Sequence, residues 1–470
     1  MNDPKLLRKF LRQTLSIFAG VCLVFTGCRP SVENTDTGVN KPNIVLIVVD
    51  DLGYGDLGSY GSKLHQTPHI DNLATTGMQF TDFHTNGPVC SPTRAALMTG
   101  QYQQRSCIES AIGFVKDGGV SLSKVTMAEV LSDVGYTCGV VGKWHLGHVD
   151  YFGPNDQGFD ISYCSNNSPD YHSHVSRNGM VDWYKDHELY EESGYLTEIV
   201  TDHSVEFIES NKRNPFFLFV SHPAVHFPFQ GPDDPPFRTT GKEWHGNERT
   251  PGKVQPDSKY GPLPPEEYKR AYRDMLEAVD ESIGTIVEAL EKLNLRERTL
   301  IVVTSDNGAY SWAGSNGVYR GQKGDLFEGG HRVPGIFNWP GKIEGGTVSD
   351  ATAMTMDLAP TFLSIADSDD SQNHPFDGVD ISPALLRKEA LPSRNLFWRF
   401  NNSYSSSHAR AVRQGDWKYV VEEGDAYLFN LSEDPGEQTN IAASNPGLIS
   451  KMEQAYLSWE QEVTNAILAK

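Results

Sequence analysis

Two short segments of the sequence, residues 44–49 and 216–220, are apolar without interruption, and residues 300–304 differ only in a final threonine. A strand with one face in water alternates apolar and polar residues, so unbroken runs predict strands that are buried on both faces. Helical patterns separate these runs, and the clearest is an apolar stripe over residues 268–293 at spacings of three and four. The sequence therefore predicts an α/β fold with a large mixed, mostly parallel sheet sandwiched by helices.

The last 80 residues have a different character. Short β-rich runs separated by turns are followed by a helical segment at 446–468; the runs are residues 396–400, 409–412, 417–421 and 426–430. This pattern predicts a smaller antiparallel sheet with one helix packed on it. Because the chain exceeds what one compact core usually holds, we expect a large domain over residues 42–390 and a C-terminal subdomain over 391–470.

Polar side chains follow the predicted strands at their carboxyl ends, where open α/β sheets bind ligands. Asp50 and Asp51 follow the first apolar run, and Asp306 and Asn307 follow the third. Together they offer four hard oxygen donors, which suit one calcium ion, suit magnesium less well and suit zinc poorly. The alternative for the first pair is a solvated turn.

The string CSPTRAALMTG occupies residues 90–100, and it predicts a short helix over 95–98 that ends at Gly100. Arg94 would favour the thiolate of Cys90, which is what a nucleophilic cysteine requires. A structural cysteine at the N-terminus of a helix is the alternative, and the string alone leaves both open.

The longer string resembles the signature of the formylglycine-dependent (type I) sulfatases, arylsulfatase-like members of the alkaline phosphatase superfamily, although Gln101 replaces the usual arginine. The string GKWHLG, with Lys143 and His145, and the string RGQKGDLFEGGHRVP, with Lys323, resemble two further motifs of that family. The histidine of VHFP aligns as well, although Val225 stands where the family usually has proline. The resemblance extends from Pro42 to the C-terminus, and it implies an alkaline phosphatase-like fold.

In this family the cysteine that matches Cys90 is oxidised after translation to an aldehyde, formylglycine. The hydrated aldehyde carries two hydroxyls: one attacks sulfur, and deprotonation of the other expels sulfate and restores the aldehyde. The resemblance implies that Asp50, Asp51, residue 90, Asp306 and Asn307 bind the metal ion, with Asp306 also acting as a base.

The same resemblance assigns roles to the remaining polar residues. Lys143, Lys323 and His226 would spread the charge of the transition state, and His226 or Lys323 would protonate the leaving alcohol. His145 would take the proton in the elimination step, and Arg94 would hold residue 90 in place. The predicted catalytic residues are thus Cys90, Arg94, Lys143, His145, His226 and Lys323.

The formal net charge of -21 argues against nucleic acid as a partner and makes a local cationic cluster necessary for an anionic substrate. We expect a sulfated carbohydrate as substrate. Oxidation of Cys90 would require a formylglycine-generating or an anaerobic sulfatase-maturing enzyme as a further partner.

The N-terminal 28 residues predict an export signal, in which basic residues precede an apolar run at 15–25 that is too short to span a bilayer. The run ends in Phe-Thr-Gly-Cys, which resembles a bacterial lipobox, so we expect a lipid anchor at Cys28 in the periplasm or at the cell surface. A plain signal peptide with a chance cysteine is the alternative. Residues 29–41 suit a flexible linker.

The sequence does not decide the roles of several further segments and residues. Loop 166–174, with Asp170, His172 and His174, could touch substrate, and loop 230–263 reads as a surface rim that selects substrate. His222 is a weaker site candidate than His226. Cys107 and Cys164 could pair. The alternative functions are a phosphonate or phosphodiester hydrolase of the same superfamily and a carbohydrate-binding lipoprotein without catalysis.

Overall fold

The computed structural model describes residues 41–113, 118–243, 265–368, 374–401 and 408–468. The predicted export signal and all but the last residue of the predicted linker lie outside the described residues, as does most of the predicted rim loop, from residue 244 onward. Among the described residues, no helix combines the length and the apolar character that crossing a bilayer requires.

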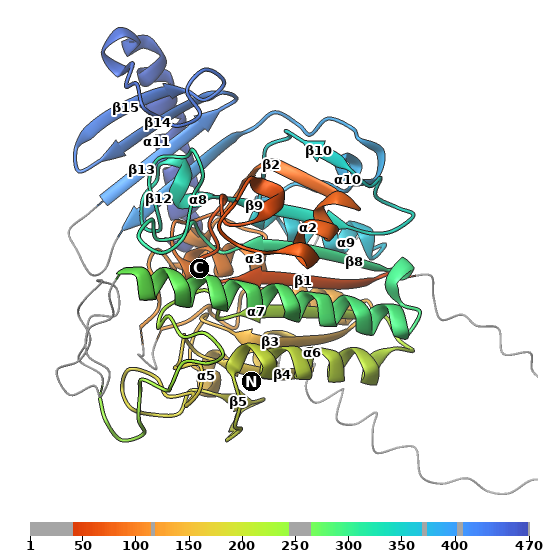
Figure 1. The fold of residues 1–470 in the computed structure, drawn as a ribbon. Helices are drawn as coiled ribbons and strands as arrows, with labels where there is room; N and C mark the ends of the chain where they lie inside the picture. The colour runs from red at the N-terminus through yellow and green to blue at the C-terminus, as the bar shows by residue number, and fades with distance from the viewer. Residues whose placement is uncertain (1–40, 114–117, 244–264, 369–373, 402–407, 469–470) are drawn as a thin grey trace, which may run out of the picture. The chain divides into compact units, whose positions relative to one another are not determined.

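A sheet of 11 strands forms the centre of the fold (Figure 1). Strand β1 (Asn43–Val49) lies between β7 (Phe216–His222) and β8 (Thr299–Ser305), and it pairs with both in parallel. These are the three apolar runs, and every residue in them is buried. The prediction of a mostly parallel sheet that is buried on both faces is confirmed.

The strand order is β10-β2-β9-β8-β1-β7-β3-β4-β5-β6, with β11 paired to β2. Strand β9 is antiparallel to both β8 and β2, which makes the sheet mixed. The remaining strands are β2 (Met78–His84), β3 (Thr137–Lys143), β4 (Ile161–Ser165), β5 (Tyr184–Lys185), β6 (Glu188–Leu189), β9 (Arg332–Asn338), β10 (Thr347–Ser349) and β11 (Ala353–Met354).

Helices cover both faces of this sheet because successive side chains of each strand point to opposite sides. Val45, Ile47 and Val49 belong to one apolar cluster, and Ile44, Leu46 and Val48 belong to the other. The first face packs against α2 (Pro68–Thr75), α6 (Leu196–Asn211) and α7 (Pro265–Lys292), and the second against α3 (Cys90–Thr99), α4 (Met127–Asp133), α9 (Leu358–Ile365) and α10 (Ser382–Arg387). The long α7 carries the apolar stripe that its sequence predicts.

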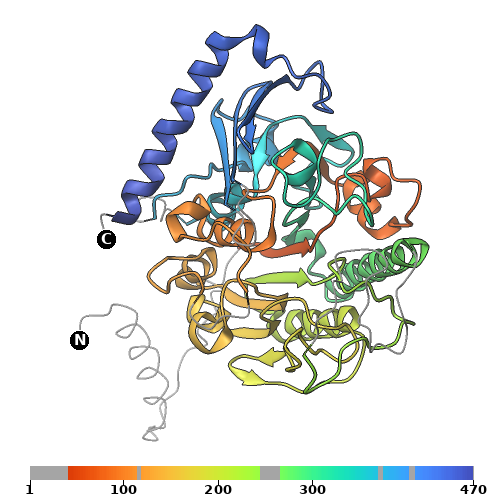
Figure 2. The ribbon, with the colours of Figure 1, turned by 90° about the vertical axis from the view of Figure 1, so that its left-hand side faces the viewer.

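The C-terminal residues form a second sheet of four antiparallel strands, with the long helix α11 beside it (Figure 2). The elements are β12 (Asn395–Asn401), β13 (His408–Gln414), β14 (Trp417–Glu422), β15 (Asp425–Asn430) and α11 (Pro446–Leu468). Apolar side chains of α11, among them Met452 and Trp459, share one cluster with Val420 and Leu428 of the strands. The predicted small antiparallel sheet with one helix is therefore confirmed.

A buried ionic network connects this small sheet to the short helix α8 (Glu328–His331). The Nζ atom of Lys418 in β14 lies 2.9 Å from Glu328 Oε1 and 3.0 Å from Glu437 Oε1, and all three side chains have no exposed area. Arg332, which follows α8, pairs with Glu328 and with Asp82. Arg332 is thus a structural ion-pair partner.

Candidate active site

The carboxyl ends of β1 and β8 bring four polar side chains together, because Val49 and Ser305 are partners in the parallel register. The backbone of Asp51 turns into the left-handed region (φ 64°), and its N–H donates to Asp306 Oδ1 at 3.3 Å. Asn307 Nδ2 donates to Asp51 Oδ1 at 2.6 Å. With Asp50 and Asp51 both buried, the alternative of a solvated turn is wrong.

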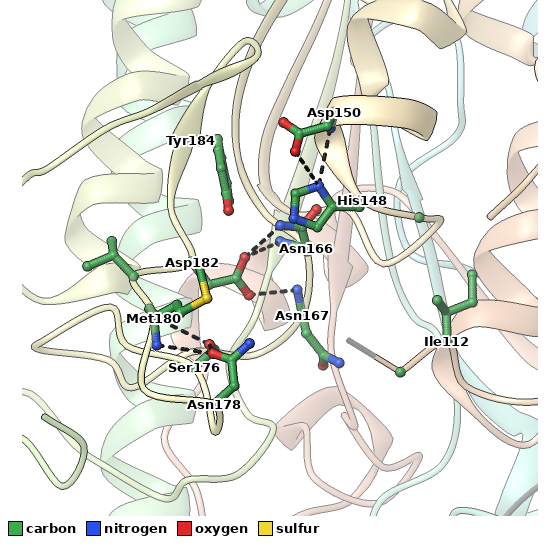
Figure 3. Close-up of a pocket in the computed structure, with 13 residues that line it drawn as sticks. Ile112, His148, Asp150, Asn166, Asn167, Ser176, Asn178, Met180, Asp182 and Tyr184 are labelled. Carbon is green, nitrogen blue, oxygen red and sulfur yellow. Dashed lines mark hydrogen bonds and ion pairs between the residues drawn. The ribbon is translucent and has the colours of Figure 1, made fainter. Parts of the chain in front are cut away.

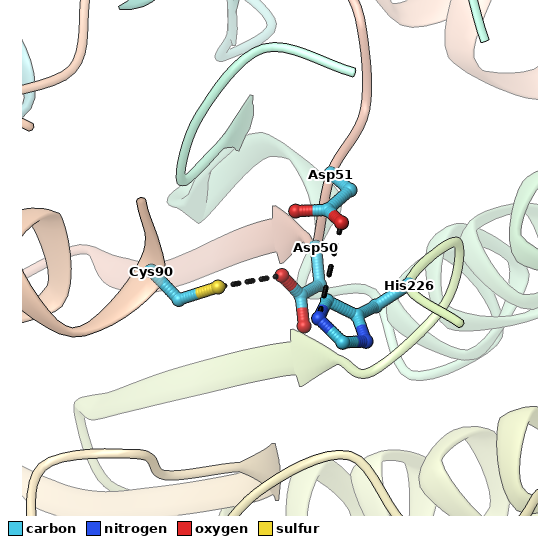
Figure 4. A group of neighbouring side chains, drawn as sticks. All are labelled: Asp50, Asp51, Cys90 and His226. Carbon is cyan, nitrogen blue, oxygen red and sulfur yellow. Dashed lines mark hydrogen bonds and ion pairs between the residues drawn. The ribbon is translucent and has the colours of Figure 1, made fainter. Parts of the chain in front are cut away.

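Helix α3 presents Cys90 to this group from its first residue (Figure 4). The predicted helix began at residue 95, but the observed helix begins five residues earlier. Pro92 is tolerated there because amides of the first turn have no partner within the helix. The Thr93 hydroxyl also accepts from the Gly87 N–H at 3.1 Å, which holds the start of the helix.

The thiol of Cys90 donates to Asp50 Oδ1 at 3.3 Å. Burial, together with the charges of Asp306 and Asp50, raises the pKa of this thiol to about 12. The unmodified side chain is therefore a protonated thiol at neutral pH, and a thiol is a weaker nucleophile than a thiolate.

Two lysines from distant parts of the chain converge on Cys90. Lys143 Nζ, at the end of β3, lies 2.5 Å from Asp50 Oδ2 and 3.6 Å from Cys90 Sγ. Lys323 Nζ lies 2.5 Å from Asp51 Oδ1 and 3.2 Å from Cys90 Sγ. These ammonium groups form the local cationic cluster that the acidic chain requires for an anionic substrate.

Arg94 lies one turn into α3, and its Nε and Nη1 donate hydrogen bonds to the walls of the site. Its Nε donates to Asp306 Oδ2 at 2.8 Å, and its Nη1 donates to the Lys143 carbonyl at 2.9 Å and to Ser221 Oγ at 2.6 Å. Arg94 therefore fixes Asp306 and the end of β3 relative to α3, and it affects residue 90 through the helix that both share.

His226 and His145 are both buried, and burial favours the neutral form of each imidazole. His226 Nε2 is 3.9 Å from Asp51 Oδ2, and its Nδ1 is 2.6 Å from the Phe227 carbonyl oxygen. Burial, with the charge of Lys323, lowers the pKa of His226 well below its ordinary value. Burial, with the charges of Lys143 and Arg94, does the same for the pKa of His145.

Strand β3 ends at Lys143, so His145 lies beyond the strand, and the backbone of His145 is left-handed (φ 57°). His145 Nε2 lies 2.9 Å from the Ile112 carbonyl oxygen, and its buried Nδ1 has no hydrogen-bond partner among the described residues. The histidine is held near the site by a turn instead of by strand alternation.

The donor set fits a hard divalent cation. Ligand atoms of Asp50, Asp51, Cys90 and His226 lie within 4.8 Å of one another. In the part of the chain that the structure describes, the buried atoms Asp51 Oδ2 and Asn307 Oδ1 have no hydrogen-bond partner. Unpartnered buried oxygens are costly, and a bound cation would satisfy them.

The pKa values of Asp50 and Asp51 also support a cation site. Burial would raise the pKa of Asp50, but the charges of Lys143, Lys323 and Arg94 outweigh it and hold that pKa well below its ordinary value. Burial raises the pKa of Asp51 to about 6 despite its contact with Lys323. A cation bound beside Asp51 would lower this pKa and keep the Asp51 carboxylate ionised.

Several residues that the sequence left open are structural. Asp170 Oδ2 accepts the backbone N–H groups of Phe237 and Arg238, whereas His172 and His174 contact backbone carbonyls. His222 Nε2 lies 3.2 Å from Ser282 Oγ. The remaining candidates, Cys107 and Cys164, are separate free cysteines, so no disulfide joins them.

Sequence reasoning missed three residues at the site. Ser168 Oγ lies 3.4 Å from Asp50 Oδ2, and Ser221 Oγ accepts from Arg94. The Tyr310 ring centroid is 5.5 Å from Lys323 Nζ. Ser221 interrupts an otherwise apolar strand end, which was a usable signal, but nothing in the sequence distinguishes Ser168 or Tyr310.

The sheet, its helices and the site at its carboxyl edge define a hydrolase of the alkaline phosphatase-like class that acts on anionic esters. The family model for sulfatases matches residues 42–368, and a model described as N-sulphoglucosamine sulphohydrolase, C-terminal, matches residues 317–460. The chain therefore belongs to the sulfatase family, and it is a sulfuric ester hydrolase. The predicted family and enzyme class are confirmed, in preference to a phosphonate or phosphodiester hydrolase.

Relatives and solved structures agree with this assignment. The N-acetylgalactosamine-6-sulfatase of Rattus norvegicus is 33% identical over 404 residues, which cover 80% of this chain and 71% of the relative. Arylsulfatase G of Rattus norvegicus is 29% identical, covering 92% of this chain and 88% of the relative. The crystal structure of Ps i-CgsB in complex with k-i-k-neocarrahexaose has a TM-score of 0.78 at 30% identity, covering 89% of this chain and 92% of that chain.

Proposed function

We propose that this protein is an exported sulfatase that hydrolyses sulfate esters of a sulfated carbohydrate, with formylglycine made from Cys90 and one calcium ion. The observation that carries this proposal is the surroundings of Cys90 Sγ. A carboxylate oxygen and two ammonium nitrogens lie within 3.6 Å of that buried atom. An anionic group that reaches residue 90 meets both cations at once.

Asp50, Asp51, Asp306 and Asn307 would hold the calcium ion, since all four present oxygen donors at one sheet edge. When bound, the ion supplies a Lewis acid next to residue 90. Formylglycine, when hydrated, supplies a hydroxyl nucleophile that is regenerated without a second attack at sulfur. The neutral His226 adds a nitrogen to the same group: its Nδ1–H faces the Phe227 carbonyl oxygen, so its Nε2 carries a lone pair and suits a further ligand, which leaves Lys323 to protonate the leaving alcohol.

The protein's own side chains would bind and orient the ester. Lys143 and Lys323 would each pair with a sulfate oxygen, which places sulfur against residue 90 and stabilises the charge that develops there. Arg94 keeps Asp306 oriented through its Nε contact. Neutral His145, whose Nδ1 has no partner among the described residues, is suited to accept a proton from residue 90.

A sulfated sugar is supported as the substrate by the names of the relatives, one of which is an N-acetylgalactosamine-6-sulfatase, and by a structural neighbour that binds k-i-k-neocarrahexaose. Export with a lipid anchor at Cys28, to the bacterial periplasm or cell surface, is supported by the N-terminal sequence pattern. Maturation would depend on a formylglycine-generating or anaerobic sulfatase-maturing enzyme of the host.

The test is the mass of the peptide that contains residue 90, taken from protein made in its native host and assayed for sulfate release from 4-nitrophenyl sulfate. We expect a mass about 18 Da below that of the cysteine form. Cys90→Ala should abolish release, whereas Cys138→Ala, at a buried cysteine in β3, should keep it. Active protein with an unmodified thiol at residue 90 would refute the formylglycine proposal.

Metal identity is tested separately on protein treated with a chelator. Calcium should raise the melting temperature more than magnesium at equal concentration, because a ligand that binds only the folded state stabilises it. Asp306→Asn should reduce this shift. An equal shift with both ions, or none, would contradict the assignment of calcium.

A further inference from the structure

A hollow with a cavity volume of about 190 Å³ lies beside the reaction centre (Figure 3). Its walls come from residues 112–113, from the segment after β3 and from the loop between β4 and β5. None of the residues that touch Cys90 lines it. The hollow is smaller than the roughly 300–1,000 Å³ of pockets for drug-sized ligands, so it suits a ligand about the size of one sugar ring.

The hollow and the reaction centre share their walls. Ile112, which lines the hollow, holds His145 through its carbonyl oxygen at 2.9 Å. Asn167, which also lines it, is followed by Ser168, whose Oγ lies 3.4 Å from Asp50 Oδ2. A group that sits in the hollow is therefore the immediate neighbour of a group that reaches residue 90.

The lining excludes anions. Among the described residues that form it, none is a lysine or an arginine, whereas Asp150 and Asp182 both contribute carboxylates. Asp182 is buried and accepts the N–H and side-chain amide of Asn166, each at 2.9 Å. His148 also lines the hollow, but its Nδ1 is engaged with Asp150 Oδ2 at 3.3 Å, so a sulfate group placed here would face two carboxylates and neither a lysine nor an arginine.

The rest of the lining suits an uncharged carbohydrate, which has apolar C–H faces and hydroxyls at its edges. Apolar surface comes from Ile112, Val181, Met180 and the ring of Tyr184. Side-chain amides of asparagine supply donors and acceptors for hydroxyls. The combination contrasts with the reaction centre, where lysines dominate.

The rim of the hollow is preorganised. Ser176 N–H donates to the Met180 carbonyl at 2.8 Å, and Met180 N–H donates to Asn178 Oδ1 at 3.1 Å, so the chain is closed into a tight turn. This turn leaves Met180 63% exposed. A flexible thioether at a fixed position is an adaptable apolar contact for a ring.

We propose that this hollow is a binding site for an uncharged sugar residue linked to the sulfated one. The proposal rests on the function proposed above and makes it more specific. The enzyme would prefer carbohydrate in which the sugar next to its target carries no sulfate.

The test uses κ- and ι-neocarratetraose, of which only the ι form carries a sulfate on each anhydrogalactose beside a sulfated galactose, together with 4-nitrophenyl sulfate, which has no sugar next to the ester. Met180→Lys adds a cation at the rim. Val348→Lys, at another exposed apolar residue (64% exposed) on β10 at the opposite edge of the sheet, is the matched control. Release of sulfate and calorimetric binding are both measured.

We expect wild-type protein to prefer the κ substrate. Met180→Lys should lower kcat/KM for κ about tenfold and raise it for ι, with hydrolysis of the aryl sulfate unchanged. Binding of the two tetrasaccharides should shift in the same directions, which decides the matter even if neither is hydrolysed. Val348→Lys should resemble wild type.

The inference would be overturned if wild type and Met180→Lys each bound the two tetrasaccharides equally well. It would also be overturned if Met180→Lys, but not Val348→Lys, lost aryl sulfate hydrolysis to the same extent as κ hydrolysis. Failure of the wild-type protein to hydrolyse any of the three esters would instead count against the proposed function. The binding arm separates these two cases.

Discussion

Replacing His222 by glutamine should make the protein less sensitive to acid. His222 is completely buried at the end of β7, and its Nε2 lies 3.2 Å from Ser282 Oγ. Burial alone lowers its pKa from the ordinary 6.5 to about 3. The folded protein therefore keeps this imidazole neutral at pH values where the unfolded chain has already protonated it.

The sign and size of the change in the free energy of unfolding follow from proton linkage. Below pH 6.5 the unfolded state binds a proton that the folded state does not bind, so stability falls as the pH falls, until both states are protonated below about pH 3. Each pH unit in that window costs about 1.4 kcal/mol. Between pH 7 and pH 5 this single histidine should therefore remove about 2 kcal/mol from the free energy of unfolding.

The assay is urea unfolding at pH 7 and pH 5, followed by tryptophan fluorescence. Glutamine can still bond to Ser282 but does not titrate, so the loss of stability between the two pH values should be about 2 kcal/mol smaller in His222→Gln than in wild type. His408→Gln, at an exposed histidine, is the control. An identical pH dependence in His222→Gln and wild type would refute the reasoning, and a selective loss of kcat would return His222 to the site.

Two further substitutions test how the site is supported. Lys418→Met leaves the buried Glu437 without its cation and Glu328 with Arg332 alone, so it should cost about 3–5 kcal/mol of stability in urea unfolding. The exposed Lys292→Met should change that stability by less than about 1 kcal/mol, and equal effects of the two substitutions would contradict a role for the network. Gly142→Ala combines a left-handed φ of 113° with a Cβ 1.9 Å from the Ser221 carbonyl oxygen, and it should prevent soluble expression. Gly135→Ala has the strained φ of 95° but open space, so it should cost only about 1–2 kcal/mol; similar yields of the two variants would show that the contact with Ser221 is unimportant.

Much of the fold could be predicted because its signals are local. Unbroken apolar runs identified β1, β7 and β8, and the capping box of Thr126 and Glu129, which both residues complete in the structure, marks the start of α4. The antiparallel β9 was not predicted. Its first three residues are the last three of the Lys323 motif, and the residue pattern of a strand does not reveal the direction in which the strand pairs.

The sequence by itself determined which residue types stand at strand ends, and through the family resemblance it indicated Cys90, two lysines and the acidic group as one site. Only the tertiary structure decided how they meet: strand order places Lys143 and Lys323 on one sulfur atom although 180 residues separate them. It also separated His226, which faces Asp51, from His222, which faces Ser282. The physical reason is that hydrophobic periodicity records whether a residue is buried, whereas convergence depends on pairing register and on turns at single residues, which leave no periodic trace in the sequence.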